Sequence, residues 1–294
     1  MGKKNSKIHV LTCGGIGDVI LLTPALREIK RSSPESVLIV HAIHKKHRDV
    51  LLNNPHIDVL RVESKALVVC VTLLRMSGYL PVRYRVPGYG VYAPSLWVPP
   101  KHATEVIAEL CGVQLSHSTP ELFLTPTEEE FAKKALEGLK LPVAIHTRSS
   151  RIHKDWPDRK WASLVSRNPH CSFVELGVCG ERRLEGTVEL PIDIDVRHDF
   201  ALLKHCRAFV GIESCFAHAA AALGVPGVVL FGSSSPNTWG YPSSLNLSIG
   251  LRCSPCIDII GGNKCPYDVA CMNMMTVEAV EDSLRRQLTP VIDF

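Results

Sequence analysis

The sequence contains no apolar run long enough to span a bilayer, so a membrane-spanning helix is not expected. It also lacks a strong excess of charge of one sign: 33 Lys and Arg stand against 29 Asp and Glu. A net charge of +4, without a long basic run, falls short of a nucleic-acid-binding signature. No short-period repeat or low-complexity tract is visible, which argues against a repeat architecture.

The composition is typical of a globular protein with enough hydrophobic residues for a large core. The chain has 294 residues, of which 46% are hydrophobic, enough for one large domain or two of ordinary size. Eleven cysteines are scattered through apolar segments, an odd number that suits reduced thiols and a cytoplasmic location. Met1–Lys7 is polar, so a signal peptide is not expected.

The stretch Ala208–Pro242 is the most informative in the chain. An apolar run at Ala208–Val210 leads through Glu213 into a small-residue helix, and a second apolar run follows at Gly227–Phe231. This order predicts a βαβ unit whose polar turn lies at the carboxyl ends of parallel strands. A helix start at that edge offers backbone N–H groups and partial positive charge, which suit a phosphate or pyrophosphate.

Strands and helices alternate in two consecutive halves of the chain. We therefore expect an α/β fold of two Rossmann-like, doubly wound domains facing each other across a cleft. We place the first domain at residues 1–126 and the second at residues 127–294. Thr127 and Glu130 fit a capping box at the start of the second domain. The segment Tyr79–Tyr92, rich in Tyr, Arg, Pro and Gly, is expected to be a long loop.

The first half opens with a glycine-rich turn, Gly14-Gly15-Ile16-Gly17-Asp18, between a strand and a helix. Glycines at Gly15 and Gly17 would let a ligand approach the backbone while Asp18 presents a carboxylate. Alternatively, Asp18 is only the N-cap of the following helix. Pro24 lies early in that helix, so a distortion is expected there.

The segment His146–Pro157, HTRSSRIHKDWP, follows a predicted strand and gathers hydroxyl groups and cations. The hydroxyls are at Thr147, Ser149 and Ser150, and the cations are at Arg148, Arg151 and Lys154. Such groups suit phosphate oxygens, which take hydrogen bonds and charge together. A solvated polar loop is the alternative. We favour a ligand because Trp156 and Pro157 would stiffen the loop.

Ser214 and His218 are four residues apart and so share one face of the predicted helix. A histidine on an alanine-rich helix is usually packed or hydrogen-bonded. Its position one turn inside an anion-binding helix start gives a ligand-binding role comparable weight.

Four cysteines near the carboxyl terminus have the number and the first spacing of a thiolate metal site: Cys253, Cys256, Cys265 and Cys271. Zinc or iron would fit tetrahedral thiolate ligation. The later spacings match no standard zinc module, so packed thiols or a facultative disulfide in this loop, residues 253–271, are alternatives.

Together the motifs resemble the ADP-heptose:lipopolysaccharide heptosyltransferase family, glycosyltransferase family nine. The resemblance rests on four ordered motifs and the late cysteine segment: GDxILLTPAL at Gly17–Leu26, KDWP at Lys154–Pro157, VGIESxxAHAAAALGVP at Val210–Pro226, FGSSSPxxW at Phe231–Trp239, and CSPC…CP…CM at Cys253–Met272.

This resemblance implies a GT-B fold and an inverting glycosyltransferase that needs no metal for its chemistry. By resemblance, Asp18 is the general base that takes the proton of the acceptor hydroxyl. The donor is a nucleotide-diphosphate sugar, with an ADP-sugar favoured. The resemblance implies donor-binding roles for Ser149, Ser150, Lys154, Glu213, Ser214, Cys215 and His218.

The acceptor implied is a glycan, a glycolipid or another macromolecule, and the expected location is the cytoplasm or the inner face of the membrane. The family usually has Asp-Ser/Thr-Gly where this chain has Glu213-Ser214-Cys215. That departure supports an alternative: a sugar-nucleotide-binding or assembly protein on the same fold, with a catalytically lapsed site.

Overall fold

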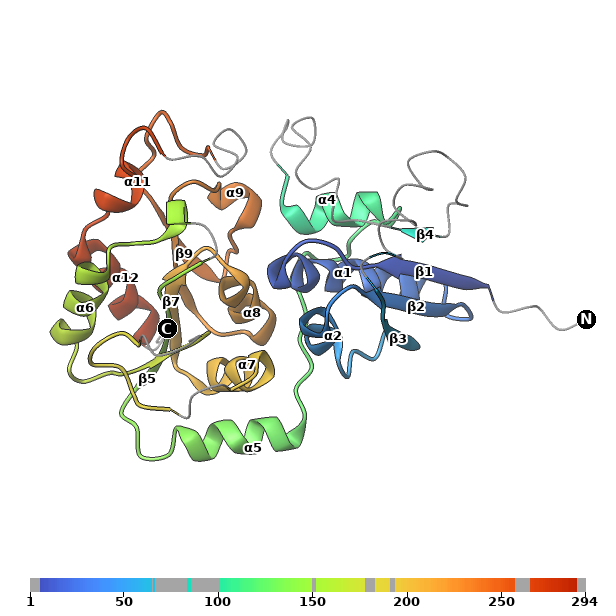
Figure 1. The fold of residues 1–294 in the computed structure, drawn as a ribbon, viewed down its shortest axis with the longest axis horizontal. Helices are drawn as coiled ribbons and strands as arrows, with labels where there is room; N and C mark the ends of the chain where they lie inside the picture. The colour runs from blue at the N-terminus through green and yellow to red at the C-terminus, as the bar shows by residue number, and fades with distance from the viewer. Residues whose placement is uncertain are drawn as a thin grey trace, which may run out of the picture. The chain divides into compact units, whose positions relative to one another are not determined.

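The computed structural model describes residues 6–64, 66, 84–85, 101–149, 152–177, 183–190, 194–256 and 265–289. The chain divides into two compact units, Met1–Leu124 and Thr125–Phe294, and each unit has its own parallel β-sheet (Figure 1). The predicted α/β class with parallel sheets is confirmed. Among the described helices, none combines the length and the apolar character needed to cross a bilayer.

The sheet of the first unit has the strand order β3-β2-β1-β4, with all pairs parallel. Its strands are β1 (Lys7–Leu11), β2 (Val37–Ala42), β3 (Val59–Val62) and β4 (Tyr84–Arg85), and its helices are α1 (Ile16–Ser32), α2 (Lys45–Leu51) and α4 (Ala103–Leu110). Strand β4 falls inside the segment Tyr79–Tyr92 that we expected to be loop, and the rest of that segment lies outside the described residues.

Helix α1 begins differently from our prediction. Its N-cap is Gly15, and Asp18 lies three residues later, where its carboxylate accepts a hydrogen bond from the Gly15 N–H at 2.7 Å. The interpretation of Asp18 as the N-cap is therefore wrong, because the glycine turn lets the helix start earlier. Pro24 lies in mid-helix and has no N–H to donate to the carbonyl of Ile20. The Thr23 hydroxyl donates to that carbonyl instead, at 2.7 Å.

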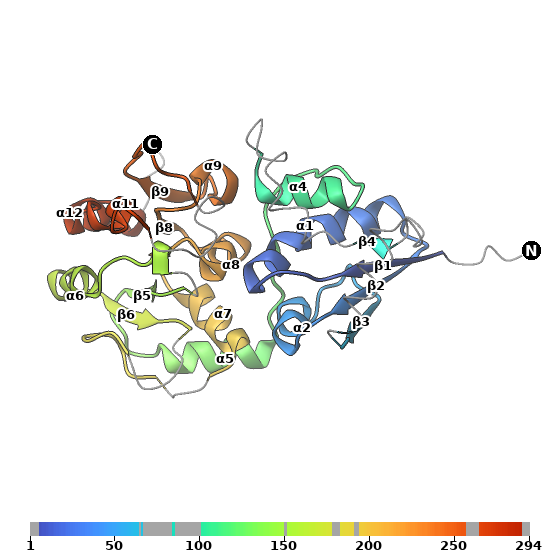
Figure 2. The same cartoon turned by 45° about the horizontal axis from the view of Figure 1, so that its top comes forward.

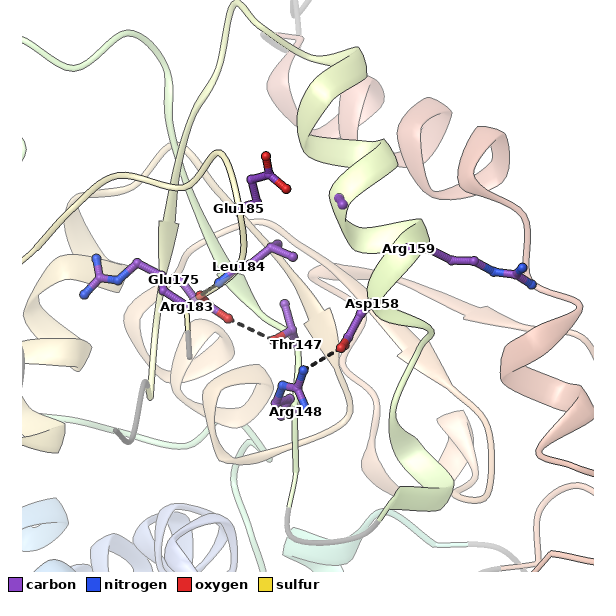
Figure 3. Close-up of a pocket in the computed structure, with 9 residues that line it drawn as sticks. Thr147, Arg148, Asp158, Arg159, Glu175, Arg183, Leu184 and Glu185 are labelled. Carbon is purple, nitrogen blue, oxygen red and sulfur yellow. Dashed lines mark hydrogen bonds and ion pairs between the residues drawn. The ribbon is translucent and has the colours of Figure 1, made fainter. Parts of the chain in front are cut away.

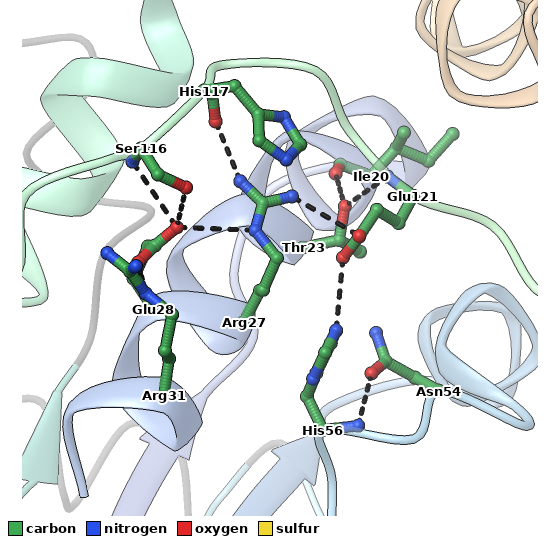
Figure 4. A network of polar contacts seen from close by, with 10 residues as sticks. All are labelled: Ile20, Thr23, Arg27, Glu28, Arg31, Asn54, His56, Ser116, His117 and Glu121. Carbon is green, nitrogen blue, oxygen red and sulfur yellow. Dashed lines mark hydrogen bonds and ion pairs between the residues drawn. The ribbon is translucent and has the colours of Figure 1, made fainter.

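A polar network ties the segment before residue 124 to α1 (Figure 4). The buried carboxylate of Glu28 accepts hydrogen bonds from Ser116, Arg27 and Arg31. Arg27 in turn donates to the carbonyl of His117 at 2.7 Å. Burial of Glu28 would raise its pKa, but the hydrogen bonds outweigh this and lower the pKa to about 2.

The sheet of the second unit has the order β6-β5-β7-β8-β9, again with every pair parallel. Its strands are β5 (Pro142–His146), β6 (Ser172–Glu175), β7 (Ala208–Ile212), β8 (Gly227–Phe231) and β9 (Ser244–Ser248). Its helices are α5 (Pro126–Ala135), the short 3-10 turn η2 (Ile152–Lys154), α6 (Asp158–Arg167), α7 (Val196–His205), α8 (Cys215–Leu223), α9 (Pro236–Trp239), α11 (Ala270–Asn273) and α12 (Val277–Leu288).

Helices cover both faces of this second sheet. Helices α6 and α12 pack together on one face, and α7 and α8 pack together on the other, as Figure 2 shows. Strand β5 is followed by β6 on one side and has β7 on its other side, so the winding direction reverses between β5 and β7. Ligands of open α/β sheets bind outside the carboxyl ends of the strands at such a switch point.

Helix α5 opens the second unit with a capping box two residues before the one we predicted. Thr125 is the N-cap, its side chain accepts from the N–H of Glu128, and the Glu128 carboxylate accepts from the N–H of Thr125. Our assignment of the cap to Thr127 and Glu130 is wrong, because Pro126 occupies the first helical position, where its missing N–H costs nothing.

Candidate functional site: a buried ion pair at the switch point of the second sheet

The loops after β5 and β7 bring one cation and one carboxylate together. Lys154, at the end of the η2 turn, places its Nζ against Oε2 of Glu213, the residue that follows β7. The two side chains are 15% and 5% exposed, so the ion pair is largely removed from water. It lies where the sheet topology predicts a ligand site.

Glu213 is held by more than the lysine. The hydroxyl of Ser234, in the loop after β8, donates to Oε2 at 2.7 Å, and Nε2 of His218 lies 3.7 Å from Oε1. Burial would raise the pKa of this carboxyl, but the charges of Lys154 and His218 and the hydrogen bonds outweigh it and lower the pKa. Glu213 is therefore a fixed carboxylate at neutral pH.

His218 lies one turn into α8 and is 2% exposed. Its Nδ1 lies 3.0 Å from the hydroxyl oxygen of Tyr241, and its ring also meets Trp239. Our sequence interpretation missed Tyr241, because the bond spans 23 residues and no motif includes it. Ser234 was also not predicted as a site residue, although it lies in the family-like motif Phe231–Trp239.

The start of α8 carries the features of an anion site. Ser214 is the N-cap but its hydroxyl makes no capping bond, and neither Ser214 Oγ nor the buried Ser233 Oγ has a hydrogen-bond partner among the described residues. Burial, aided by the charge of Asp199, raises the pKa of the Cys215 thiol to about 12. Cys215 therefore brings no negative charge to this helix start at neutral pH.

The loop after β5 is anchored in the core, as the sequence suggested. Trp156 is 1% exposed, and its indole N–H donates to the carbonyl of Met275 at 3.0 Å. The N–H of Ser149 donates to Oδ1 of Asp155 at 2.9 Å. Ser150, the other predicted hydroxyl ligand, lies outside the described residues.

A separate hollow of about 270 Å³ lies beside α6 (Figure 3). Its lining residues are Thr147, Arg148, Asp158, Arg159, Ala162, Glu175, Arg183, Leu184 and Glu185. Their polar groups largely satisfy one another: Thr147 donates to Glu175 at 3.0 Å and Arg148 to Asp158 at 2.7 Å. Thr147 and Arg148 of the predicted phosphate-binding segment line this hollow, but Glu175 and Asp158 already pair with them. None of Ser149, Lys154, Glu213, Ser214, Cys215 and His218 lines it, so we do not assign the donor site to it.

The remaining predicted residues of the first unit gather at the start of α1. Gly14 has φ of +80°, and a Cβ atom there would lie 2.2 Å from Oδ2 of Asp18. Glycine is therefore required at Gly14. Gly15 precedes the helix, and Gly17 lies in its first turn. The structure thus brings Gly15, Gly17 and Asp18 into one turn.

The four cysteines of the late loop influence one another. Burial, together with the charges of Cys271, Cys253 and Cys265, raises the pKa of the Cys256 thiol to about 11. All four are free thiols. Yet within the described part of the chain, no group of three or more His, Cys, Asp or Glu side chains is arranged to hold a metal ion.

Comparison with known proteins agrees with this architecture. Residues 168–261 match the family model described as glycosyltransferase family 9 (heptosyltransferase). Lipopolysaccharide heptosyltransferase 1 of Pseudomonas aeruginosa is 25% identical over 170 residues, which are 53% of this chain. The match spans about half, 48%, of that relative's length.

Solved structures share the fold over nearly the whole chain. A glycosyl transferase family 9 protein from Veillonella parvula has a TM-score of 0.72 at 18% identity, over 96% of this chain and 97% of its own. The iron-containing dodecameric glycosyltransferase TibC from enterotoxigenic E. coli has a TM-score of 0.72 at 16% identity, over 97% and 78%. These structural matches confirm the GT-B fold, and the family-model match over residues 168–261 confirms the resemblance of this chain to the heptosyltransferase family, glycosyltransferase family 9.

Proposed function

We propose that this chain is an inverting glycosyltransferase that moves a sugar from a nucleotide-diphosphate sugar to an acceptor hydroxyl. The observation that carries the proposal is the Lys154–Glu213 pair at the switch point between β5 and β7, beside the start of α8. A cation, unpartnered hydroxyls and a helix N-terminus at one place suit a diphosphate better than a neutral ligand.

The donor diphosphate would be bound by Lys154, Ser149 and Ser150 from the loop after β5 and by Ser214 at the helix start. The unpartnered hydroxyls of Ser214 and Ser233 support this role, because buried donors without partners are uncommon. Glu213, Cys215 and His218 would lie beneath the diphosphate and the sugar. An ADP-sugar is favoured, since TibC has been described in complex with ADP-D-beta-D-heptose.

In the proposed step, the acceptor oxygen forms a bond to the anomeric carbon as Asp18 takes its proton. The anomeric carbon–oxygen bond to the diphosphate breaks, and its electron pair leaves with the nucleoside diphosphate. Lys154 and the α8 start would stabilise the charge that develops on this leaving group. A positioned base such as Asp18 contributes ~10²–10⁴-fold to such reactions.

The acceptor would be a glycan, a glycolipid or another macromolecule, met in the cytoplasm or at the inner face of the membrane. Lipopolysaccharide heptosyltransferases among the relatives support a glycolipid acceptor in particular.

For the four-cysteine loop, we propose a structural zinc or iron ion held by Cys253, Cys256, Cys265 and Cys271, with no part in the sugar transfer. The mutual influence of the four thiols and the iron in the relative TibC support it, whereas the arrangement of the described side chains does not. Metal analysis of protein purified without chelator tests this. Less than one equivalent of metal per chain, together with four titratable thiols, would contradict the proposed metal site.

The function itself is tested by a thermal-shift screen against ADP-, GDP-, UDP- and CDP-sugars, followed by an assay of nucleotide release and sugar transfer. A ligand at ~100 times its Kd adds ~2.7 kcal/mol of stability. Asp18→Asn should bind the donor normally and transfer no sugar. Transfer by Asp18→Asn at the wild-type rate would disprove the base assignment. Donor binding without any turnover by the wild type would favour the lapsed binding protein.

A further inference from the structure

The position of the Asp18 carboxylate depends on the turn that precedes α1. Oδ2 of Asp18 accepts the Gly15 N–H at 2.7 Å. Gly14, with φ of +80°, leaves room for the same oxygen where a Cβ atom would collide with it. A shift of the Gly14–Gly15 turn would therefore move the carboxylate with it.

This turn is held from the neighbouring helix α2 by a buried histidine, His47, which is 2% exposed. Nδ1 of His47 lies 2.8 Å from Oγ1 of Thr12, at the end of β1. The ring also faces the backbone of Gly14, and this interaction raises the pKa of the imidazole. That direction is the one expected when a backbone carbonyl faces a ring N–H.

Thr12 is itself fixed to the neighbouring strand. Its N–H donates to the carbonyl of His41 at 2.9 Å, and its hydroxyl oxygen accepts from the N–H of Ile43 at 3.2 Å. The chain of contacts therefore runs from the second strand, through Thr12 and His47, to the Gly14 carbonyl.

The chemistry of His47 suits a fixed support. Burial, together with the charge of His44, lowers its pKa to about 4, so the ring is neutral at physiological pH. A neutral imidazole has one donating and one accepting nitrogen. The Thr12 hydroxyl lies 3.4 Å from the carbonyl of His41 and 2.8 Å from Nδ1 of His47. Donation along the shorter contact leaves the N–H of the ring for the backbone of Gly14.

We infer that His47 is a positioning residue for the transfer reaction: it holds the Gly14–Gly15 turn and, through the Gly15 N–H, the carboxylate of Asp18. The inference rests on the proposed function, in which Asp18 is the base. His47 acts on the reaction only through this turn, and it has no part in binding the donor.

The test compares His47→Leu, which can form no hydrogen bond, with His47→Asn, which keeps a donor and an acceptor near the Nδ1 position. Lys46→Leu, an exposed substitution on the same helix, is the matched control. The readouts are kcat and KM for ADP release from ADP-heptose, and the amide exchange rate of Gly15 measured by NMR.

We expect His47→Leu to lower kcat by about 10- to 100-fold, because small misplacements of a catalytic group cost that much. Its KM for the donor should stay within about twofold, as expected for a residue remote from donor binding. Gly15 exchange should be faster than in the wild type, His47→Asn should recover part of kcat, and Lys46→Leu should match the wild type.

The inference would be overturned if His47→Leu is folded, has the wild-type kcat and shows unchanged Gly15 exchange. It would also be overturned if the variant loses thermal stability but keeps the wild-type kcat. Asp18→Asn, assayed in parallel, separates this failure from that of the proposed function. If Asp18→Asn is inactive, the base assignment stands and only the role of His47 is lost. If Asp18→Asn is fully active, the base assignment fails and the inference falls with it.

Discussion

The ammonium group of Lys154 contacts the buried carboxylate of Glu213 across the switch point between β5 and β7. The two residues are 59 positions apart in the chain, and Ser234 joins them from a third strand-end loop. This ion pair organises the candidate donor site, and it has consequences for stability as well as for binding.

Replacing one partner of the pair should be costly. Lys154→Met should lower the free energy of unfolding by about 3–5 kcal/mol, because it leaves the Glu213 carboxylate buried without its cation. The double variant Lys154→Met/Glu213→Gln should recover much of that loss. Urea unfolding monitored by circular dichroism measures both.

Lys204→Met is the control for this pair, since the Lys204–Glu129 ion pair is 39% and 27% exposed and should contribute at most ~1 kcal/mol. Equal losses of unfolding free energy for Lys154→Met and Lys204→Met would show that the Lys154–Glu213 pair contributes no more to stability than the more exposed pair.

Glu28 is expected to make the first unit sensitive to acid. Its pKa of about 2 lies below the ordinary 4.5, so the carboxylate stabilises the fold fully above pH 4.5, and the contribution is lost as pH falls through about 2. Glu28→Gln should cost about 1–3 kcal/mol at pH 7, from weakened bonds to Ser116, Arg27 and Arg31. The difference between variant and wild type should shrink below pH 4.5; a constant difference down to pH 2 would contradict this account.

Asp199 is expected to have the opposite effect on how stability depends on pH. Burial raises its pKa from 3.8 to about 7, despite a hydrogen bond from the Gly177 N–H, so the folded protein binds this proton more tightly than the unfolded chain. Stability should therefore fall as pH rises from about 4 to about 7. Asp199→Asn, which stays neutral, should abolish this fall and be more stable at pH 8, by on the order of 2–4 kcal/mol. Parallel pH–stability curves for the variant and the wild type would refute the assignment.

Much of the fold was predictable because it depends on local patterns. The apolar runs and the helix between them in Ala208–Pro242 occur in the structure as β7, α8 and β8. The prediction that Lys154 and Glu213 belong to one site came from their places after predicted strands, and their contact follows from the parallel topology.

Other features could not be predicted because they depend on distant contacts or on glycine conformation. Tyr241 and His47 are defined by partners 23 and 35 residues away, and no motif includes those pairs. The start of α1 was misplaced because Gly15 serves as an N-cap without a side chain, which moved Asp18 inside the helix. The same turn is what gives Asp18 its fixed orientation.

The most direct test of the donor site is the Kd of ADP, measured by isothermal titration calorimetry on the wild type, Lys154→Met and Lys204→Met. The account predicts that the wild type binds ADP and that Lys204→Met binds it equally well. Lys154→Met should bind at least tenfold more weakly, as expected for the loss of a charge-assisted hydrogen bond to phosphate. Equal affinity of Lys154→Met and the wild type, or no ADP binding by the wild type, would contradict the account.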